Sequence, residues 1–227
     1  THLFSSAASD VYKRQAMNTT MMAGATVRLL KNFNLDNVFQ AFDKSTLMMG
    51  VPTFYTRLLK DKRLNKKHTK NMRLFISGSA PLLKETHKNF YDITGHHILE
   101  RYGMTETNMN SSNPLDGVRK AGSVGKPIKD INIRISATEG SVVSNKNQIG
   151  MIEIKGPNVF KGYLNKLDQT KEAFTKDGYF ITGDIGYFDD DGYLYISGRN
   201  KDLIISGGYN VYPKEIEDVI NKYENVI

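Results

Sequence analysis

The sequence from Thr26 to Leu99 alternates short apolar runs of strand length with longer segments whose apolar residues recur at helical spacing. The runs that we expect to form strands are 26–30, 46–49, 72–76 and 98–99, and the expected helices are 35–42, 52–59 and 81–93. Strand–helix alternation with short connections is typical of right-handed crossovers, so this pattern predicts a parallel sheet covered by helices. The fold class of this part of the chain is therefore α/β.

Two loops follow strands of this predicted sheet, at Ser77–Pro81 and Tyr102–Glu106. Because the strands run in the same direction, we expect both loops to open on the carboxyl edge, where ligands bind in open α/β sheets. Tyr102 offers a ring face for a planar base, Thr105 a hydroxyl, and Glu106 an oxygen ligand that suits Mg²⁺. We expect the strand to end in a turn at Gly103 that places these three side chains at its carboxyl end. The motif alone leaves another interpretation open, in which the strand and the turn lead into an exposed Thr–Glu helix cap.

After about residue 115 the apolar pattern changes to the two-residue period of half-exposed strands. Residues 131–135 and 149–154 alternate in this way, and two apolar runs flank Asp189–Gly192, which predicts a hairpin. The acidic turn lacks the spacing of a calcium loop, so we prefer the hairpin. This part of the sequence predicts a small antiparallel β-sheet or barrel.

Composition excludes several function classes. The chain has no cysteine, which excludes disulfides, a thiol nucleophile and a Cys–His zinc site. It has no apolar run near the roughly 18 residues that span a membrane. The formal net charge of +7 permits an anionic partner, but the densest basic stretch, 60–70, lacks interleaved aromatic residues and is interpreted as solvated surface. We expect no nucleic-acid partner, although a basic α/β module that binds nucleic acid is kept as a remote alternative. We expect a cytoplasmic location, with a mitochondrial one left open.

Four motifs stand in order along the chain: SGSAP at 77–81, YGMTE at 102–106, GYFITGD at 178–184 and GRNKDLIISGGYNVYP at 198–213. From about Ala16 to the end, this series closely resembles the adenylate-forming family of acyl-CoA synthetases, luciferases and peptide-synthetase adenylation domains. The resemblance implies that a carboxylic acid attacks the α-phosphate of ATP, giving an acyl-adenylate and pyrophosphate. Coenzyme A then displaces AMP. The implied small-molecule partners are the acid, ATP with Mg²⁺, and coenzyme A.

The resemblance also implies roles for the residues of the first two motifs. Ser79, Ala80 and Pro81 would flank one face of the purine and Tyr102 the other. Thr105 resembles a phosphate-contacting hydroxyl and Glu106 the Mg²⁺ ligand, and electrostatic help of this kind is usually the largest catalytic contribution. By the same resemblance, the nucleotide site would also include the other residues of this strand: Glu100, Arg101, Gly103 and Met104.

The later motifs would complete the site. Asp184 resembles the carboxylate that accepts from both ribose hydroxyls, and Arg199 a residue that contacts ribose. Lys201 stands where the family has the hinge between its large and small domains, and Gly207 and Gly208 would line the pantetheine tunnel. Taken singly, each of these residues could equally be an ordinary turn or loop residue.

Strings at 49–59, 100–110, 113–117 and 155–162 look most like the malonyl-CoA synthetase branch of the family. A dicarboxylic acid needs a cation for its second carboxylate, and a bidentate Arg contact is strong and selective. Arg119 is the first candidate, with Ser112 as a hydroxyl partner, and Arg57 is the second. Arg119 could instead be a plain loop charge. A medium-chain, aryl or methylmalonyl acid remains the alternative substrate.

The resemblance divides the chain into four segments. Residues 16–115 would be the C-terminal part of a large α/β subdomain, 116–200 an antiparallel β subdomain, and 201–227 the hinge and the start of a small α+β domain. Residues 1–15 show no clear period and are interpreted as a cloning or assembly scar outside the fold. Nothing here resembles the family's phosphate loop or the catalytic Lys of its small domain. We therefore expect a fragment that is inactive alone and binds nucleotide weakly.

Overall fold

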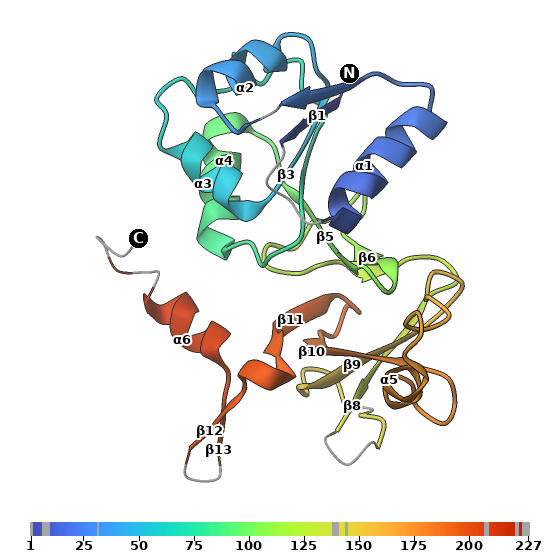
Figure 1. Cartoon of the computed structure of the whole chain (residues 1–227). Helices are drawn as coiled ribbons and strands as arrows, with labels where there is room; N and C mark the ends of the chain where they lie inside the picture. Colours follow the sequence, from blue (N-terminus) through green and yellow to red (C-terminus); the bar gives the residue numbers. More distant parts are fainter. Residues whose placement is uncertain are drawn as a thin grey trace. The chain divides into compact units, whose positions relative to one another are not determined.

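The computed structural model describes residues 2–5, 10–30, 32–137, 141–143, 145–206, 209–220 and 223, with the backbone alone described before residue 16. The chain divides into two compact units, Thr1–Gly125 and Lys126–Ile227 (Figure 1). Each unit is described separately below. No helix in the described part of the chain is both long enough and apolar enough to cross a membrane.

The first unit is an α/β layer structure, as the sequence predicts. Its sheet has the strand order β2-β1-β3-β4-β5-β6, in which β1 to β5 pair in parallel and β6 pairs antiparallel to β5. The strands are β1 (His2–Ser5), β2 (Val27–Leu30), β3 (Leu47–Gly50), β4 (Leu74–Ser77), β5 (Leu99–Met104) and β6 (Asn108–Ser112). The helices are α1 (Asp10–Met22), α2 (Leu35–Phe42), α3 (Pro52–Leu59) and α4 (Lys84–Thr94).

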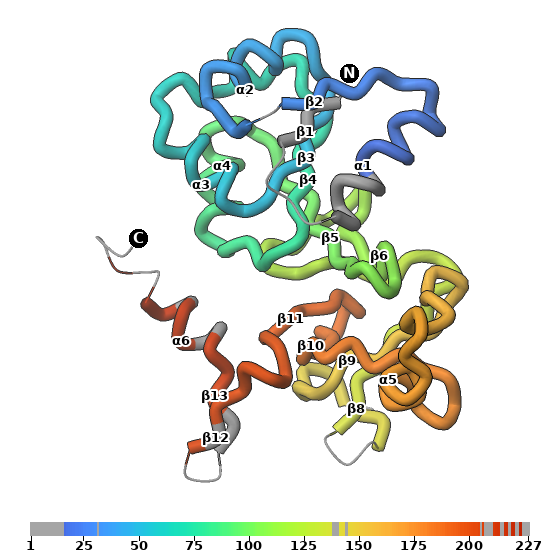
Figure 2. Tube along the Cα trace, viewed as in Figure 1, coloured from blue at the N-terminus to red at the C-terminus, as the bar shows by residue number. Residues whose placement is uncertain are grey.

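Helices cover both faces of this sheet, because alternate residues of the central strands point to opposite sides. Met48 and Phe75 pack with apolar residues of α2, α3 and α4 in the larger core. Their neighbours Met49 and Ile76 pack with Ala16 of α1 on the other face. Figures 1 and 2 accordingly show α1 on one side of the sheet and α2, α3 and α4 on the other.

The structure differs from the sequence prediction at three places in the first unit. Residues 2–5 and 10–15 are part of the fold, because His2–Ser5 forms a strand between β2 and β3, and Asp10 begins α1. The helix expected from Pro81 begins at Lys84, because the backbone is still extended at Leu83, with φ −65° and ψ 137°. The helix ends at Thr94, and Gly95 closes it with a left-handed φ of 76°. The third difference is the β5–β6 hairpin, which is part of the candidate site.

The second unit contains an antiparallel sheet in the order β11-β10-β9-β8. The sheet strands are β8 (Asn132–Ser136), β9 (Gly150–Lys155), β10 (Phe180–Phe188) and β11 (Leu194–Arg199). The other elements are β7 (Lys126–Pro127), α5 (Leu167–Glu172), the 3₁₀ helix η1 (Asn200–Asp202), the paired strands β12 (Ile204–Ser206) and β13 (Tyr209–Val211), and α6 (Pro213–Ile220).

The acidic turn between β10 and β11 is the predicted hairpin. The carboxylate of Asp189 accepts from the backbone N–H groups of Asp191, at 3.0 Å, and Tyr193, at 2.8 Å. Gly192 takes a left-handed φ of 78° that closes the turn. The acidic side chain at the start of the run therefore organises the turn itself.

Candidate functional site

The loop after β4 and the loop after β5 leave the same edge of the sheet, as predicted. Strands β4 and β5 are parallel neighbours, with Ser77 opposite Glu100. Ser79, Ala80 and Pro81 are all exposed. Ser79 has a φ of 69°, which is uncommon for a residue with a side chain and is often found at ligand sites. The loop thus presents small side chains and backbone at the carboxyl edge.

Strand β5 continues past this edge and turns back as β6. The turn lies at Thr105–Thr107 and not at Gly103, and it leads into a strand and not into a helix, so the helix-cap interpretation is wrong. Thr105 is exposed and Glu106 half-buried at this turn. The hairpin therefore carries both side chains beyond the end of β4.

Gly103 allows the two strands of the hairpin to approach closely. A Cβ atom at this position would lie 2.0 Å from the carbonyl oxygen of Asn108 and 2.9 Å from Met109 Sδ. The register of the pair shifts between Tyr102 and Gly103. Tyr102 is only 7% exposed, and its hydroxyl lies 3.9 Å from Met104 Sδ. The aromatic ring is thus held next to the turn that bears Thr105.

The structure places the carboxylate of Glu100 inside the protein. Glu100 Oε1 lies 3.3 Å from His87 Nδ1 and accepts from the backbone N–H of Gly122 at 2.9 Å. The backbone carbonyl of Glu100 accepts from Asn113, through the backbone N–H at 3.0 Å and the side-chain amide at 3.2 Å. Glu100 therefore ties β5 to α4 and to the loop that follows β6. Sequence reasoning missed His87, which stands on a helix face with no motif around it.

Arg119 is held by backbone carbonyls. Its guanidinium donates to three of them, those of His97, Pro114 and Leu115, at 2.7, 3.1 and 2.6 Å. Burial lowers the pKa of Arg119, and the charge of Asp116 opposes this shift. The Ser112 hydroxyl likewise donates to the carbonyl of Asn113 at 2.8 Å. The side chains of Arg119 and Ser112 therefore both bond backbone carbonyls of the segment that follows β6 or precedes β5.

Arg57 has different surroundings. It lies exposed in the last turn of α3, with its guanidinium carbon 4.7 Å from the centre of the Phe33 ring. Arg101, on β5, is half-buried, with one guanidinium nitrogen 3.9 Å from Met49 Sδ. Within the described part of the chain, no hydrogen bond or ion pair is formed by the side chain of Arg57.

In the second unit, Asp184 and Arg199 stand opposite each other on β10 and β11. Arg199 Nε lies 2.9 Å from Asp184 Oδ1, and the side chains are 50% and 6% exposed respectively. The structure therefore brings the two predicted ribose residues together. Lys201 is exposed in η1, directly after β11. Gly207 and Gly208 lie outside the described residues.

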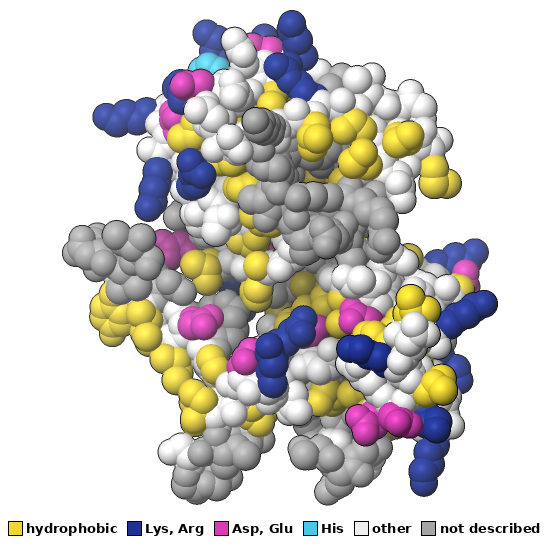
Figure 3. Space-filling model, in the orientation of Figure 1, with side chains coloured by type: hydrophobic (Ala, Val, Ile, Leu, Met, Phe, Trp, Pro, Cys, Tyr) yellow, Lys and Arg dark blue, Asp and Glu magenta, His cyan; other side chains and the backbone are white. Residues whose placement is uncertain are grey.

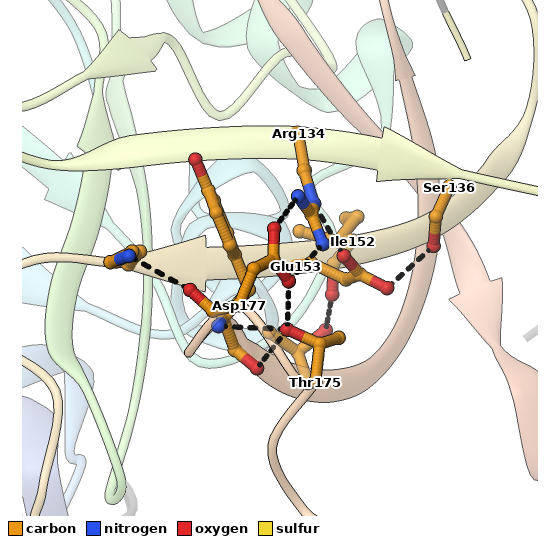
Figure 4. Close-up of polar contacts among 9 residues, drawn as sticks. Arg134, Ser136, Ile152, Glu153, Thr175 and Asp177 are labelled. Carbon is orange, nitrogen blue, oxygen red and sulfur yellow. Dashed lines mark hydrogen bonds and ion pairs between the residues drawn. The ribbon is translucent and has the colours of Figure 1, made fainter. Parts of the chain in front are cut away.

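A polar network holds the turn that precedes β10 (Figure 4). Arg134 on β8 donates to Glu153 Oε2 at 2.6 Å and to both carboxylate oxygens of Asp177, at 2.5 and 3.0 Å. The Thr175 hydroxyl donates to the same Asp177 at 2.7 Å, and Ser136 donates to Glu153 at 2.7 Å. Hydrogen bonds from Arg134 and then Thr175 hold the pKa of Asp177 well below its usual range. The network fixes the start of the strand that carries Asp184.

A magnesium ion would find few protein ligands here. Among the described residues, no group of three or more His, Asp or Glu side chains could hold a metal ion. Mg²⁺ commonly binds through one or two carboxylates, with phosphate oxygens and water completing its octahedron. Glu106 fits that pattern as a single ligand. Figure 3 shows Lys and Arg side chains scattered over the visible faces of both units, without one continuous basic stripe.

The sequence matches the family model described as AMP-binding enzyme over residues 6–164. It is 38% identical to the malonate–CoA ligase of Arabidopsis thaliana, over 93% of this chain and 38% of that protein. It is 36% identical to a long-chain-fatty-acid–CoA ligase of Bacillus subtilis, over 92% of this chain and 38% of that protein. The chain thus spans about two fifths of the length of these curated relatives.

Solved structures agree with these matches. The ATP-bound MatB of Rhodopseudomonas palustris superimposes with a TM-score of 0.92 at 48% identity, over 100% of this chain and 45% of that one. The parallel sheet with its helices and the separate antiparallel sheet are therefore those of this enzyme fold. On the family match and this likeness together, the chain belongs to the AMP-binding enzyme family.

Proposed function

We propose that the protein is an AMP-forming acid–CoA ligase, which activates a carboxylic acid with ATP and transfers the acyl group to coenzyme A. The observation that carries this proposal is the parallel pairing of β4 and β5, with Ser77 opposite Glu100. This pairing brings the exposed loop Ser79–Pro81 and the turn with Thr105 and Glu106 to one edge of the sheet. Carboxyl edges of such sheets are where nucleotides bind.

Each residue would then have a defined task in the first unit. Ser79, Ala80 and Pro81 would let the backbone approach the purine, and Tyr102 would border it. The Thr105 hydroxyl would donate to a phosphate oxygen. Magnesium, when bound, neutralises phosphate charge, and Glu106 would supply its carboxylate ligand.

In the second unit, the carboxylate of Asp184 would accept hydrogen bonds from the two ribose hydroxyls. A carboxylate has about four acceptor sites on its two oxygens, and the bond from Arg199 uses one of them. Arg199 would orient that carboxylate and contact ribose as well, which its half-exposed side chain allows. Lys201 would serve as the hinge, and Gly207 and Gly208 would line the path of coenzyme A.

We favour malonate as the acid. Support comes from the Arabidopsis relative, which is named a malonate–CoA ligase. The similar identity to a long-chain-fatty-acid ligase keeps a different acid as the alternative. For the second carboxylate of malonate, Arg57 is better supported than Arg119 with Ser112, because the guanidinium of Arg119 already donates to three backbone carbonyls.

A chimera tests the proposal. In it, residues 16–227 of this chain replace the matching segment of the Rhodopseudomonas palustris MatB; we call it the MatB chimera. Pyrophosphate release is measured with ATP, magnesium and either malonate, methylmalonate, benzoate or octanoate. We expect release with malonate to exceed release with octanoate by up to about 100-fold, because octanoate has no second carboxylate to accept from the guanidinium and a hydrogen bond to a charged group contributes about 1.5–3 kcal/mol.

Two results would contradict these statements separately. A folded chimera with faster release on a monocarboxylate would reject malonate and leave the ligase activity standing. A folded chimera that releases no pyrophosphate with any acid would reject the ligase activity itself. The chimera with the substitution Asp184→Asn, which removes the charge of the proposed ribose-binding carboxylate, serves as the inactive reference in both cases.

A further inference from the structure

Strand β10 bulges outward next to Asp184. Ile181 pairs with Glu153 and Ile185 pairs with Met151, so three residues of β10 stand opposite the single residue Ile152 of β9. A bulge of this kind leaves backbone groups outside the regular ladder and redirects the side chains that follow. Bulges are frequent beside active sites, where they aim a side chain.

The Thr182 hydroxyl fastens both sides of the bulge. Thr182 Oγ1 donates to the carbonyl of Ile152 at 2.8 Å, and the same oxygen accepts from the backbone N–H of Asp184 at 3.0 Å. Thr182 is 6% exposed and Asp184 5% exposed. One buried hydroxyl thus bridges the neighbouring strand and the amide of the residue predicted to hold ribose.

Gly183 completes the geometry. Its φ of 75° lies in the left-handed region, and a Cβ atom there would meet nothing within 4 Å. The requirement for glycine is therefore one of backbone conformation and not of space. After this residue, Asp184 returns to register opposite Arg199, with the 2.9 Å ion pair already described.

We propose that Thr182 is a positioning residue that fixes where the Asp184 carboxylate stands, and that it does so through its hydroxyl. The consequence for nucleotide binding rests on the proposed function, in which Asp184 accepts from ribose. The effect on the Asp184 amide does not rest on it. The two parts can therefore fail independently.

A second threonine supplies a matched control. Thr170 Oγ1 donates to the carbonyl of Lys166 at 2.8 Å and accepts from the backbone N–H of Tyr163 at 2.9 Å. This hydroxyl also donates to a carbonyl and accepts from a backbone N–H in the same unit, in less buried surroundings and at a place with no predicted ligand contact. A general loss of stability would follow from either threonine, whereas an effect on Asp184 would follow from Thr182 alone.

The experiment uses the full chain and the variants Thr182→Val, Thr182→Ser and Thr170→Val. Two quantities are measured: the hydrogen-exchange rate of the Asp184 amide by NMR, and the Kd for AMP by calorimetry. Thr182→Val removes the hydroxyl at nearly constant size, so we expect about tenfold faster exchange and about tenfold weaker AMP binding, as for one lost buried hydrogen bond. Thr182→Ser keeps the hydroxyl and is expected to stay within about twofold of the parent in both, as is Thr170→Val.

A combination with Asp184→Asn separates positioning from general stability. If Thr182 acts through the carboxylate, Thr182→Val should weaken AMP binding less than about twofold further in the Asp184→Asn chain, because coupled residues are not additive. An equal loss in both backgrounds would overturn the proposal. Unchanged exchange of the Asp184 amide in Thr182→Val would also overturn it.

Two further outcomes remain decisive. If Thr182→Val does not fold, Thr182→Ala removes the hydroxyl without placing a methyl group against the Ile152 carbonyl, and Thr182→Ser must fold with parent-like exchange or the proposal is wrong. If the chain binds no AMP, that result counts against the proposed function, and the exchange rates alone decide the role of Thr182.

Discussion

Glu100 Oε1 and His87 Nδ1 lie 3.3 Å apart, and both side chains are buried. His87 Nε2 in turn lies 3.3 Å from His97 Nδ1, whose ring stacks on Tyr91 with centroids 4.0 Å apart. Burial, then the neighbouring His87 and Arg119, lower the pKa of His97. A buried carboxylate is stable only when it is paired, so His87 holds the strand that leads to Tyr102.

Replacement of His87 by leucine should destabilise the chain strongly. The Glu100 carboxylate would lose its imidazole partner and keep the N–H of Gly122, and the loss of one partner of a buried polar group typically costs about 1–3 kcal/mol in the free energy of unfolding. Urea unfolding measures the change. His68→Leu is the control, because His68 is exposed and should change the free energy by no more than about 0.5 kcal/mol. Equal changes in the two variants would show that the His87–Glu100 contact contributes no measurable stability.

The two arginine candidates predict opposite patterns. In the MatB chimera, Arg57→Met should lower malonate-dependent pyrophosphate release by about 10- to 100-fold through the loss of a charged hydrogen bond. Use of octanoate should hardly change. Arg119→Met should instead lower the free energy of unfolding by about 1–3 kcal/mol, because three carbonyls lose their donor. A selective loss of malonate use in Arg119→Met would restore Arg119 as the anchor.

Gly103→Ala should disturb the turn that carries Thr105 and Glu106. The added methyl would lie 2.0 Å from a backbone oxygen that cannot move without its strand. We expect a loss of about 1–3 kcal/mol in the free energy of unfolding, as in overpacked cores, and weaker binding of ATP with magnesium by the MatB chimera.

Gly24→Ala is the control for Gly103→Ala. Gly24 has a φ of 60° and nothing within 4 Å of an added Cβ. It should therefore lose only the roughly 1–2 kcal/mol of left-handed strain and leave ATP binding unchanged. If Gly103→Ala binds ATP as tightly as Gly24→Ala does, the hairpin turn is not part of the nucleotide site.

Acid should weaken the second unit through Asp177. Hydrogen bonds from Arg134 and Thr175 lower the pKa of Asp177 in the folded chain, whereas the pKa of an Asp in an unfolded chain is about 3.9. The stability it contributes is therefore present above about pH 4 and is lost as the pH falls from there towards the folded pKa. Its side chain is 57% exposed, so solvent screening reduces the effect.

Urea unfolding at about pH 6 and about pH 3 measures this loss. We expect Asp177→Asn to lose less stability between the two pH values than the parent does. Asp168→Asn is the control, since Asp168 is 96% exposed and lies 3.9 Å from Lys171. Parent-like acid sensitivity in Asp177→Asn would show that other carboxylates dominate.

The sequence predicts elements well where the information is local. Pro52 begins α3 and Gly95 ends α4 because each residue restricts its own backbone. The strands predicted at 131–135 and 149–154 are confirmed as β8 and β9, because the two-residue apolar period that predicts them is also a local pattern. The Asp–Gly turn between β10 and β11 likewise depends on side chains within the turn.

Elements that depend on distant partners escaped prediction. Strand β6 is polar, with the sequence NMNSS, and it is a strand because it pairs with β5. Strand β1 is four residues long and is defined by its two neighbours. The same limit applies to the site: Thr182 bonds a carbonyl 30 residues earlier in the chain, and no local pattern reveals that partner.

The place of β1 between β2 and β3 has a practical consequence for shortened versions of this protein. A chain cut to start at Ala16 would lose the interior strand through which β2 joins the sheet. The facing backbone groups of β2 and β3 would then be unpaired, and open strand edges recruit strands from other molecules. Such a truncation should therefore suffer in solubility far more than the loss of a short, featureless leader would suggest.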